Sequence, residues 1–226
     1  MASRFNGYIM NDKKALIPKY AIVPIIFYCL AVPSYFLVRF LTEGRSFYDA
    51  SFFLDEKIPF LPIFIWIYVL AYLQWFIGYF AVMRSNETTC KTYFGAEFIG
   101  KLTCVLIFAL IPTTMVRPEL SGSGLTNDLM QWMYSIDSPD NLFPSIHCME
   151  SWLVARGLME TKAPRAAKIL MWVFSILVFM SVVFVKQHVV IDIAGGIAVA
   201  ELAIYLSKRL NMPGFYTAIE KRLCLG

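Results

Sequence analysis

Long apolar runs separated by short polar segments dominate this chain of 226 residues. A helix needs about 20 mostly apolar residues to cross the hydrocarbon core of a bilayer. Six runs are candidates for such helices. They are residues 20–41, 60–83, 97–116, 146–159, 166–185 and 189–206. The pattern therefore predicts an all-α integral membrane protein, with six transmembrane helices in a single domain that takes in residues 1–226.

The fourth run, 146–159, is the shortest of the six and contains Glu150 and Arg156. Taken alone, it also fits a helix that lies at the membrane interface. We count it as a span because the distribution of basic residues described below requires it.

A second amphipathic segment lies in the loop between the third and fourth runs. Its apolar residues recur at helical spacing: Leu125, Leu129, Trp132 and Met133. The spacing fits either a short helix in the membrane interface or an ordinary amphipathic helix within a loop.

The composition excludes several classes of protein. Hydrophobic residues make up 58% of the chain and charged residues 16%, whereas soluble domains have about 45–50% and about 25%. The net charge of +4 is spread along the chain, so we expect no nucleic acid partner. The five cysteines have no spacing typical of a disulfide framework or a zinc site.

The basic residues indicate an orientation in the membrane. With the N-terminus inside, only five of the 20 Lys and Arg fall in outer segments. These five are Arg39, Arg45, Lys57, Arg117 and Lys186. Cytoplasmic loops carry an excess of Lys and Arg. We therefore predict that both termini lie inside.

The only two histidines of the chain fall on the same face of the membrane in this topology. His147 lies at the outer start of the fourth run, and His188 at the outer start of the sixth. Arg117 and Lys186 are expected at the outer ends of the third and fifth runs. Two imidazoles and two cations from separate segments are thus predicted to meet at the extracytoplasmic face.

The spacing of His188 and Asp192 suggests a chemical role. Residues i and i+4 are neighbours on one face of a helix, so the carboxylate can accept the proton of one imidazole nitrogen. The other nitrogen is then free to act as a nucleophile.

Three other residues suit a bound phosphate. Ser145 precedes His147 near a predicted helix N-terminus, where it could cap the helix or donate to an oxyanion. Arg117 can bind two phosphate oxygens at once, and Lys186 acts as a point charge.

Each of these residues also has an ordinary structural explanation. A single histidine at a membrane interface is usually a packing residue, and Lys186 alone resembles a residue that flanks a span. Two histidines and an aspartate could also hold zinc or iron. We prefer a phosphate site without metal or cofactor, because a metal site does not explain two cations at the same place.

Three segments resemble the signature segments of the type 2 phosphatidic acid phosphatase superfamily, the lipid phosphate phosphatases. They are Arg117-Pro118, Pro144-Ser145-Ile146-His147 and the run from Ser181 to Asp192, all within residues 117–196. The resemblance implies six spans and a metal-independent phosphatase. It also implies that His188 becomes phosphohistidine, that Asp192 orients it and that His147 protonates the leaving alcohol. Arg117 and Ser145 would bind the phosphate.

The chain departs from the family pattern at three positions. The family has lysine where Leu110 stands, arginine where Val182 stands, and commonly glycine where Ile146 stands. Lys101 is 16 residues before Arg117, about 24 Å along a helix, and we expect it to be too far away to replace the missing lysine. Lys186 is the candidate to replace the missing arginine.

The second and third segments look closer to the branch that includes inositol phosphorylceramide synthase. That branch transfers a phosphoryl-bearing headgroup to another alcohol. The departures from the family pattern concern the substrate more than the reaction class, so we expect hydrolysis of a lipid phosphate or diphosphate monoester. The alternative is transfer of a phospholipid headgroup to another alcohol by the same His-His-Asp site. A lipid-phosphate binding protein is a third possibility. The vanadium haloperoxidases of the superfamily fit less well, because they are soluble. Membrane lipids and a lipid phosphate substrate are the expected partners, whereas the lipid and the oligomeric state are not predicted.

Overall fold

The computed structural model describes residues 15–223 and is almost entirely helical. The first half contains α1 (Ile22–Ala31), α2 (Ser34–Thr42), β1 (Tyr48–Asp49), α3 (Phe53–Lys57), α4 (Ile65–Met83) and α5 (Glu87–Leu110). The second half contains β2 (Thr113–Thr114), α6 (Leu125–Ile136), α7 (Ile146–Met159), α8 (Arg165–Phe184), α9 (Val190–Arg209) and α10 (Met212–Arg222). Two 3₁₀ turns, η2 (Lys19–Ala21) and η3 (Pro62–Phe64), precede α1 and α4.

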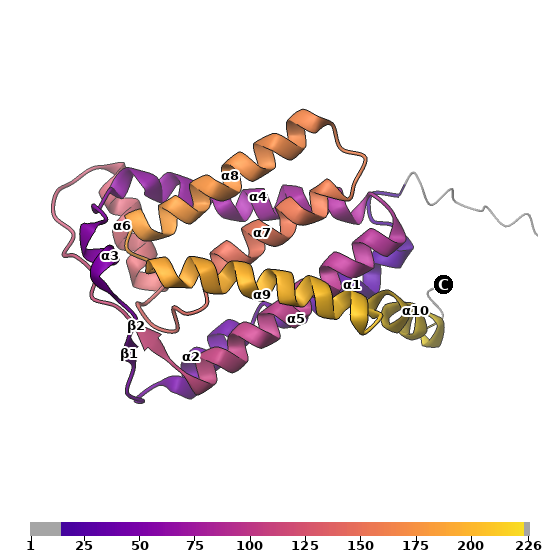
Figure 1. The fold of residues 1–226 in the computed structure, drawn as a ribbon, viewed down its shortest axis with the longest axis horizontal. Coiled ribbons are helices and arrows are strands. Elements are labelled where there is room, and N and C mark those ends of the chain that lie inside the picture. Colours follow the sequence, from indigo (N-terminus) through magenta and orange to yellow (C-terminus); the bar gives the residue numbers. More distant parts are fainter. Residues whose placement is uncertain (1–14, 224–226) are drawn as a thin grey trace, which may run out of the picture.

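Five helical segments among the described residues are long and apolar enough to cross a membrane. They are Lys19–Thr42, Pro62–Met83, Glu87–Leu110, Arg165–Phe184 and Val190–Arg209. These helices run along the long axis of the molecule (Figure 1). The prediction of a multi-pass, all-α membrane protein is therefore confirmed.

Helix α7 begins and ends where the sequence predicted a fourth span. Its 14 residues give a length of about 21 Å, which is shorter than the hydrocarbon core of about 30 Å. It nevertheless packs against four long helices, α4, α5, α8 and α9. It is thus a central helix of the bundle, and a sixth membrane crossing stays a prediction.

The prediction for the third span, 97–116, was wrong at both ends, because α5 extends from Glu87 to Leu110. The helix begins earlier because Asn86 caps it, accepting a hydrogen bond from the backbone N–H of Thr89. The polar first turns are buried against α10, where Lys91 pairs with Glu220 at 2.6 Å. Pro112 accounts for the early end, because a residue that precedes proline disfavours the helical conformation.

The i, i+4 spacing of Arg156 and Glu160 predicts an ion pair between them, and this prediction was wrong. Arg156 pairs instead with Glu201 on α9, with 2.8 Å between Nε and Oε1. Glu160 lies 3.1 Å from Lys208. A charged residue such as Glu201 within a predicted span is expected to have an internal partner, and Arg156 provides it.

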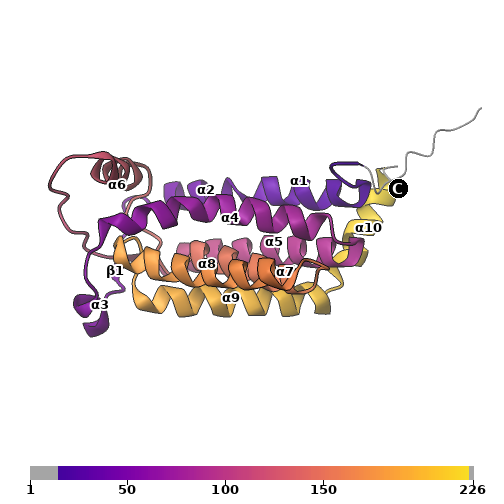
Figure 2. The same ribbon diagram turned by 90° about the horizontal axis from the view of Figure 1, so that it is seen from above.

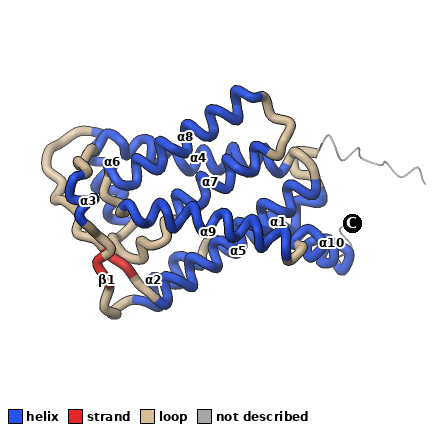
Figure 3. Tube along the Cα trace, viewed as in Figure 1, coloured by secondary structure: helices blue, strands red, loops and turns tan. Residues whose placement is uncertain are grey.

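The two ends of the bundle differ in structure. Short elements and most of the longer loops gather at one end, with α3, α6 and the small parallel sheet of β1 and β2 (Figures 1 and 3). Helix α6, which the sequence predicted, crosses this end of the bundle (Figure 2). Helix α10 lies at the opposite end, in contact with α9 (Figure 1). Of the 15 basic residues predicted to lie inside, Lys221 and Arg222 are in the last turn of α10, and Lys208 and Arg209 are in the last turn of α9. Three of those basic residues, Arg4, Lys13 and Lys14, lie outside the described residues.

Candidate active site

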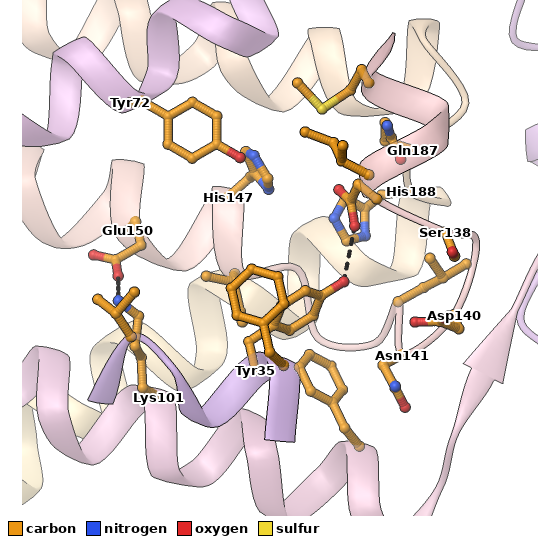
Figure 4. A pocket seen from close by; sticks show the side chains of 18 of the residues that line it. Tyr35, Tyr72, Lys101, Ser138, Asp140, Asn141, His147, Glu150, Gln187 and His188 are labelled. Atoms are coloured by element: carbon orange, nitrogen blue, oxygen red, sulfur yellow. Dashed lines mark hydrogen bonds and ion pairs between the residues drawn. The ribbon is translucent and has the colours of Figure 1, made fainter. Parts of the chain in front are cut away.

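Both histidines lie at the end of the bundle that carries α3 and α6. His188 is in the turn between α8 and α9, and His147 is the second residue of α7. Their ring centroids are 6.1 Å apart. Both line one cavity of about 290 Å³, which Figure 4 shows from close by. The structure thus brings together the two imidazoles that are 41 residues apart in the sequence.

The carboxylate of Asp192 contacts the ring of His188. The carboxylate is fully buried, and its Oδ2 lies 3.0 Å from His188 Nδ1. The same oxygen accepts a hydrogen bond from the backbone N–H of Val189 at 3.0 Å. This arrangement favours a proton on Nδ1 and leaves Nε2 of His188 as the basic nitrogen.

The start of α7 is bound to the start of α9. The backbone N–H of Ser145 donates to the backbone oxygen of Asp192 at 3.1 Å. Gly196 permits this approach, because a Cβ there would lie 2.5 Å from the Ser145 carbonyl oxygen. A small residue in a span suits close helix packing, and the contacts of Gly196 confirm that prediction. One backbone framework therefore fixes the relative position of His147 and His188.

His147 sits among aromatic side chains of α4. The ring of Tyr68 stacks on it, with 4.2 Å between the centroids, and Trp75 lies 5.1 Å away. The hydroxyl of Tyr68 lies 3.5 Å from His147 Nδ1. The other nitrogen, Nε2, is buried and has no hydrogen-bond partner among the described residues.

The three predicted phosphate ligands do not line the cavity. Ser145 is buried and caps α7, accepting from the backbone N–H of Cys148 at 3.3 Å. Lys186 Nζ donates to the backbone oxygens of Asp55 and Ile58, at 3.0 and 2.8 Å. Burial lowers the pKa of Lys186 from its ordinary value. The ammonium group is thus engaged with the chain around α3.

Arg117 is linked to the cavity through Gln187, which lines it. Its guanidinium donates to the backbone oxygens of Asp137 and Lys186, at 2.6 and 3.2 Å, and to the side-chain oxygen of Gln187. It also lies over the ring of Tyr134. Burial lowers the pKa of Arg117 from its ordinary value. The positive charge of Arg117 therefore contacts the side chain of Gln187, the residue before His188.

Gln187 is a cavity residue to which the sequence analysis gave no role. Only 2% of it is exposed, and its Nε2 is buried without a hydrogen-bond partner among the described residues. Because Arg117 donates to the amide oxygen, the NH₂ group is turned away from the guanidinium. Its position next to His188 was the only signal in the sequence.

A buried ion cluster lies elsewhere along the same cavity, away from His188 (Figure 4). Lys101 Nζ is 2.7 Å from Glu97 and 2.8 Å from Glu150. We expected Lys101 to be too far from the site, but it lines the same cavity as His188. The expected distance assumed one continuous helix from Lys101 to Arg117, whereas α5 ends at Leu110. Lys101 is nevertheless engaged by two carboxylates.

The described residues contain no group of three or more His, Cys, Asp or Glu side chains that could hold a metal ion. The expectation of a site without metal stays a prediction.

Comparison with known proteins gives one result. The family model of the PAP2 superfamily matches residues 84–213, more than half of the chain. Neither the curated proteins nor the solved structures provide a match. The matched range includes Arg117, both histidines and Asp192. The protein therefore belongs to the PAP2 superfamily, the type 2 phosphatidic acid phosphatases, and this membership supports a phosphatase or phosphotransferase type of function in a multi-pass membrane protein.

Proposed function

We propose that the protein hydrolyses a lipid phosphate or diphosphate monoester through a phosphohistidine on His188, without a metal ion. The observation that carries this proposal is the pair of imidazoles in one cavity, 6.1 Å apart, each with a partner at Nδ1. This arrangement provides one nitrogen for attack and another for proton transfer.

In the first step, Nε2 of His188 attacks phosphorus, and the bond between phosphorus and the ester oxygen breaks. Asp192 stabilises the positive charge that develops on the ring, because its carboxylate accepts the Nδ1 proton. With the phosphate anion bound, His147 is an imidazolium with a proton on each nitrogen, and it gives the proton of its Nε2 to the departing alcohol oxygen. The lipid alcohol leaves and the phosphoryl group stays on His188.

In the second step, water attacks phosphorus while His147 Nε2 takes a proton from the water. The bond between phosphorus and His188 breaks, and inorganic phosphate leaves. His147 thus regains from water the proton that it gave to the leaving group, and both histidines return to their starting states.

The phosphate oxygens require donors and positive charge in this cavity. Gln187 Nε2, which has no acceptor among the described residues, is a donor beside His188, and Arg117 polarises its amide. The first amides of α7 also favour an anion, since they lie at a helix N-terminus. We assign Lys186 to holding the chain around α3, because its ammonium group already donates to two backbone oxygens.

The walls of the cavity support a lipid substrate. Three apolar or aromatic side chains line it: Val32 between α1 and α2, Phe36 on α2 and Tyr72 on α4. Each of them is also exposed on the outside of the bundle. Within a bilayer, these exposed side chains would face lipid. A lipid chain could therefore remain in the hydrocarbon while its phosphate enters the cavity from the extracytoplasmic side. The proposed orientation rests on the excess of basic residues toward the α10 end.

A headgroup transferase is the second candidate, and one observation favours it. The cavity is not limited to the two histidines, because it continues to Glu150 and Lys101. A second substrate could occupy that part and replace water in the second step.

The test is phosphate release by purified protein in detergent, with EDTA, from a small panel of lipid phosphates and diphosphates. Wild type should release phosphate from at least one lipid, whereas His188→Ala and His147→Ala should not. Cys29→Ala, a change of an exposed cysteine of α1, serves as the control. If an alcohol acceptor is needed for product formation, the protein is the transferase. A requirement for a metal ion would contradict the mechanism.

A further inference from the structure

We propose that Tyr68 and Asp137 form a pair of positioning residues that fixes the tautomer and orientation of His147. The inference deepens the proposed function, because it concerns the proton donor of that reaction. It rests on a chain of contacts from three separate parts of the fold: the start of α7, helix α4 and the residue that follows α6.

The hydroxyl proton of Tyr68 has a clear acceptor. Tyr68 is fully buried, and its oxygen lies 2.9 Å from Asp137 Oδ2. A carboxylate can only accept, so Tyr68 must donate its single proton to Asp137. Its oxygen can then only accept a hydrogen bond from its other neighbour.

That other neighbour is His147 Nδ1, at 3.5 Å. Because the Tyr68 oxygen accepts, Nδ1 must carry the proton, which leaves Nε2 of the neutral ring without one. Nε2 is the buried nitrogen without a partner among the described residues. The contact is long for a hydrogen bond, but the stacking of the two rings at 26° keeps the imidazole in place. The pair thus leaves Nε2 as the nitrogen for proton transfer.

Asp137 is itself held in position. Its second oxygen accepts the hydroxyl proton of Tyr35 from α2 at 2.9 Å. Its backbone oxygen accepts from Arg117 at 2.6 Å. The carboxylate is therefore fixed by α2, α4 and the chain segment of Arg117. This combination of contacts is more than the burial of an aromatic core residue requires.

The two histidines then share one arrangement at Nδ1. In each case a carboxylate holds the proton on Nδ1: Asp192 directly for His188, and Asp137 through Tyr68 for His147. Other ionisable groups near His147 are Tyr72 on α4, Glu150 one turn further along α7, and His188 itself. None of them has a hydrogen bond to His147 Nδ1 among the described contacts.

The first experiment does not depend on activity. Because the chain has only two histidines, labelling with ¹⁵N-histidine gives spectra with two rings, and His147→Ala assigns them. At alkaline pH, the neutral ring of His147 in wild type should carry its proton on Nδ1. In Tyr68→Phe it should become a mixture of tautomers. A ring of His147 that carries its proton on Nε2 in wild type would overturn the inference.

The second experiment uses the leaving group. A nitrophenolate departs without a proton, so a defect in proton donation should slow an alkyl phosphate more than a nitrophenyl phosphate with a similar chain. Tyr68→Phe and Asp137→Asn should lower kcat for the alkyl ester about 10-fold or more, with little change in KM. They should still form phosphohistidine from the aryl ester at nearly the wild-type rate. Equal losses for both esters would indicate a merely structural role.

Tyr79→Phe is the matched control. Tyr79 is also a buried tyrosine of α4, and its hydroxyl also donates to a carboxylate, that of Glu150. Removing this hydroxyl should leave the ratio of the two rates and the tautomer of His147 unchanged. If wild type forms no phosphohistidine from either ester, the proposed function fails, whereas the tautomer measurement still decides the role of Tyr68.

Discussion

The two histidines of the cavity are supported in different ways. The partner of His188 is Asp192, which lies four residues further along the same segment, at the start of α9. The surroundings of His147 come from α4 and from the end of α6, which are 79 and 10 residues away in the sequence. The local support could be predicted from spacing, whereas the distant support could not. The comparison also suggests different roles, with one ring paired directly to a carboxylate for attack and the other linked to a carboxylate through Tyr68 for proton transfer.

The largest effect should come from removing the nucleophile. His188→Ala should lower kcat by on the order of 10⁴-fold or more and abolish the phosphoenzyme with every substrate. His147→Ala should also lose hydrolysis of alkyl esters, yet it should still accumulate phosphohistidine from an ester with a nitrophenolate leaving group. Rapid quenching followed by intact-protein mass spectrometry measures both. If the two variants behave identically with the aryl ester, the division of roles is wrong.

Asp192→Asn should have the next largest effect. The carboxamide is close in size to the carboxylate but carries no charge to stabilise the His188 imidazolium, and it can favour the wrong tautomer. We expect a loss of about 10²–10⁴-fold in kcat for both alkyl and aryl esters. This result would separate Asp192 from Asp137, whose loss should affect mainly the alkyl ester. A loss limited to alkyl esters would contradict the assignment of Asp192 to the nucleophile.

Changes at Gln187 test whether its amide binds the phosphate group beside His188. Gln187→Leu removes the free amide donor next to His188 and should lower kcat about 10²-fold, the usual cost of removing one donor to a developing negative charge. Gln187→Glu should be at least as harmful, because it places a negative charge beside the phosphate. Steady-state kinetics with the best lipid of the panel measure both. Wild-type rates in Gln187→Leu would remove this residue from the site.

Lys186 should give the smallest effect. Its ammonium group donates to backbone oxygens near α3 and not to the cavity. Lys186→Met should therefore change kcat less than about 10-fold, well below the cost of losing a direct ligand of the phosphoryl group. A loss comparable to that of Gln187→Leu would restore Lys186 as the replacement for the family arginine.

Much of the fold was readable in the sequence because a membrane imposes a simple rule on helix length and polarity. The rule failed where polar residues are buried against other helices. The first turns of α5 resemble a loop by hydropathy, but α10 covers them and Lys91 is neutralised by Glu220. The i, i+4 rule failed at Arg156, whose partner lies on another helix and not one turn away.

The candidate site shows the same limit. Spacing predicted the pair of His188 and Asp192, and topology predicted that His147 would join them. Tyr68 and Asp137 had no such signal, because a tyrosine in an aromatic-rich span and an aspartate after an amphipathic helix are both ordinary residues. Gln187 was overlooked because its role depends on Arg117, 70 residues earlier. Contacts between distant elements arise from packing, which one sequence does not display.

The central claim is that His188 carries the phosphoryl group without a metal ion, and trapping the phosphoenzyme tests it most directly. Purified protein is mixed with substrate in EDTA, quenched at alkaline pH and analysed by peptide mass spectrometry. The account predicts a phosphoryl group on His188 in wild type, more of it in His147→Ala with an aryl ester, and none in His188→Ala. A phosphoryl group on His147, or activity that disappears with EDTA and returns with a divalent cation, would contradict it.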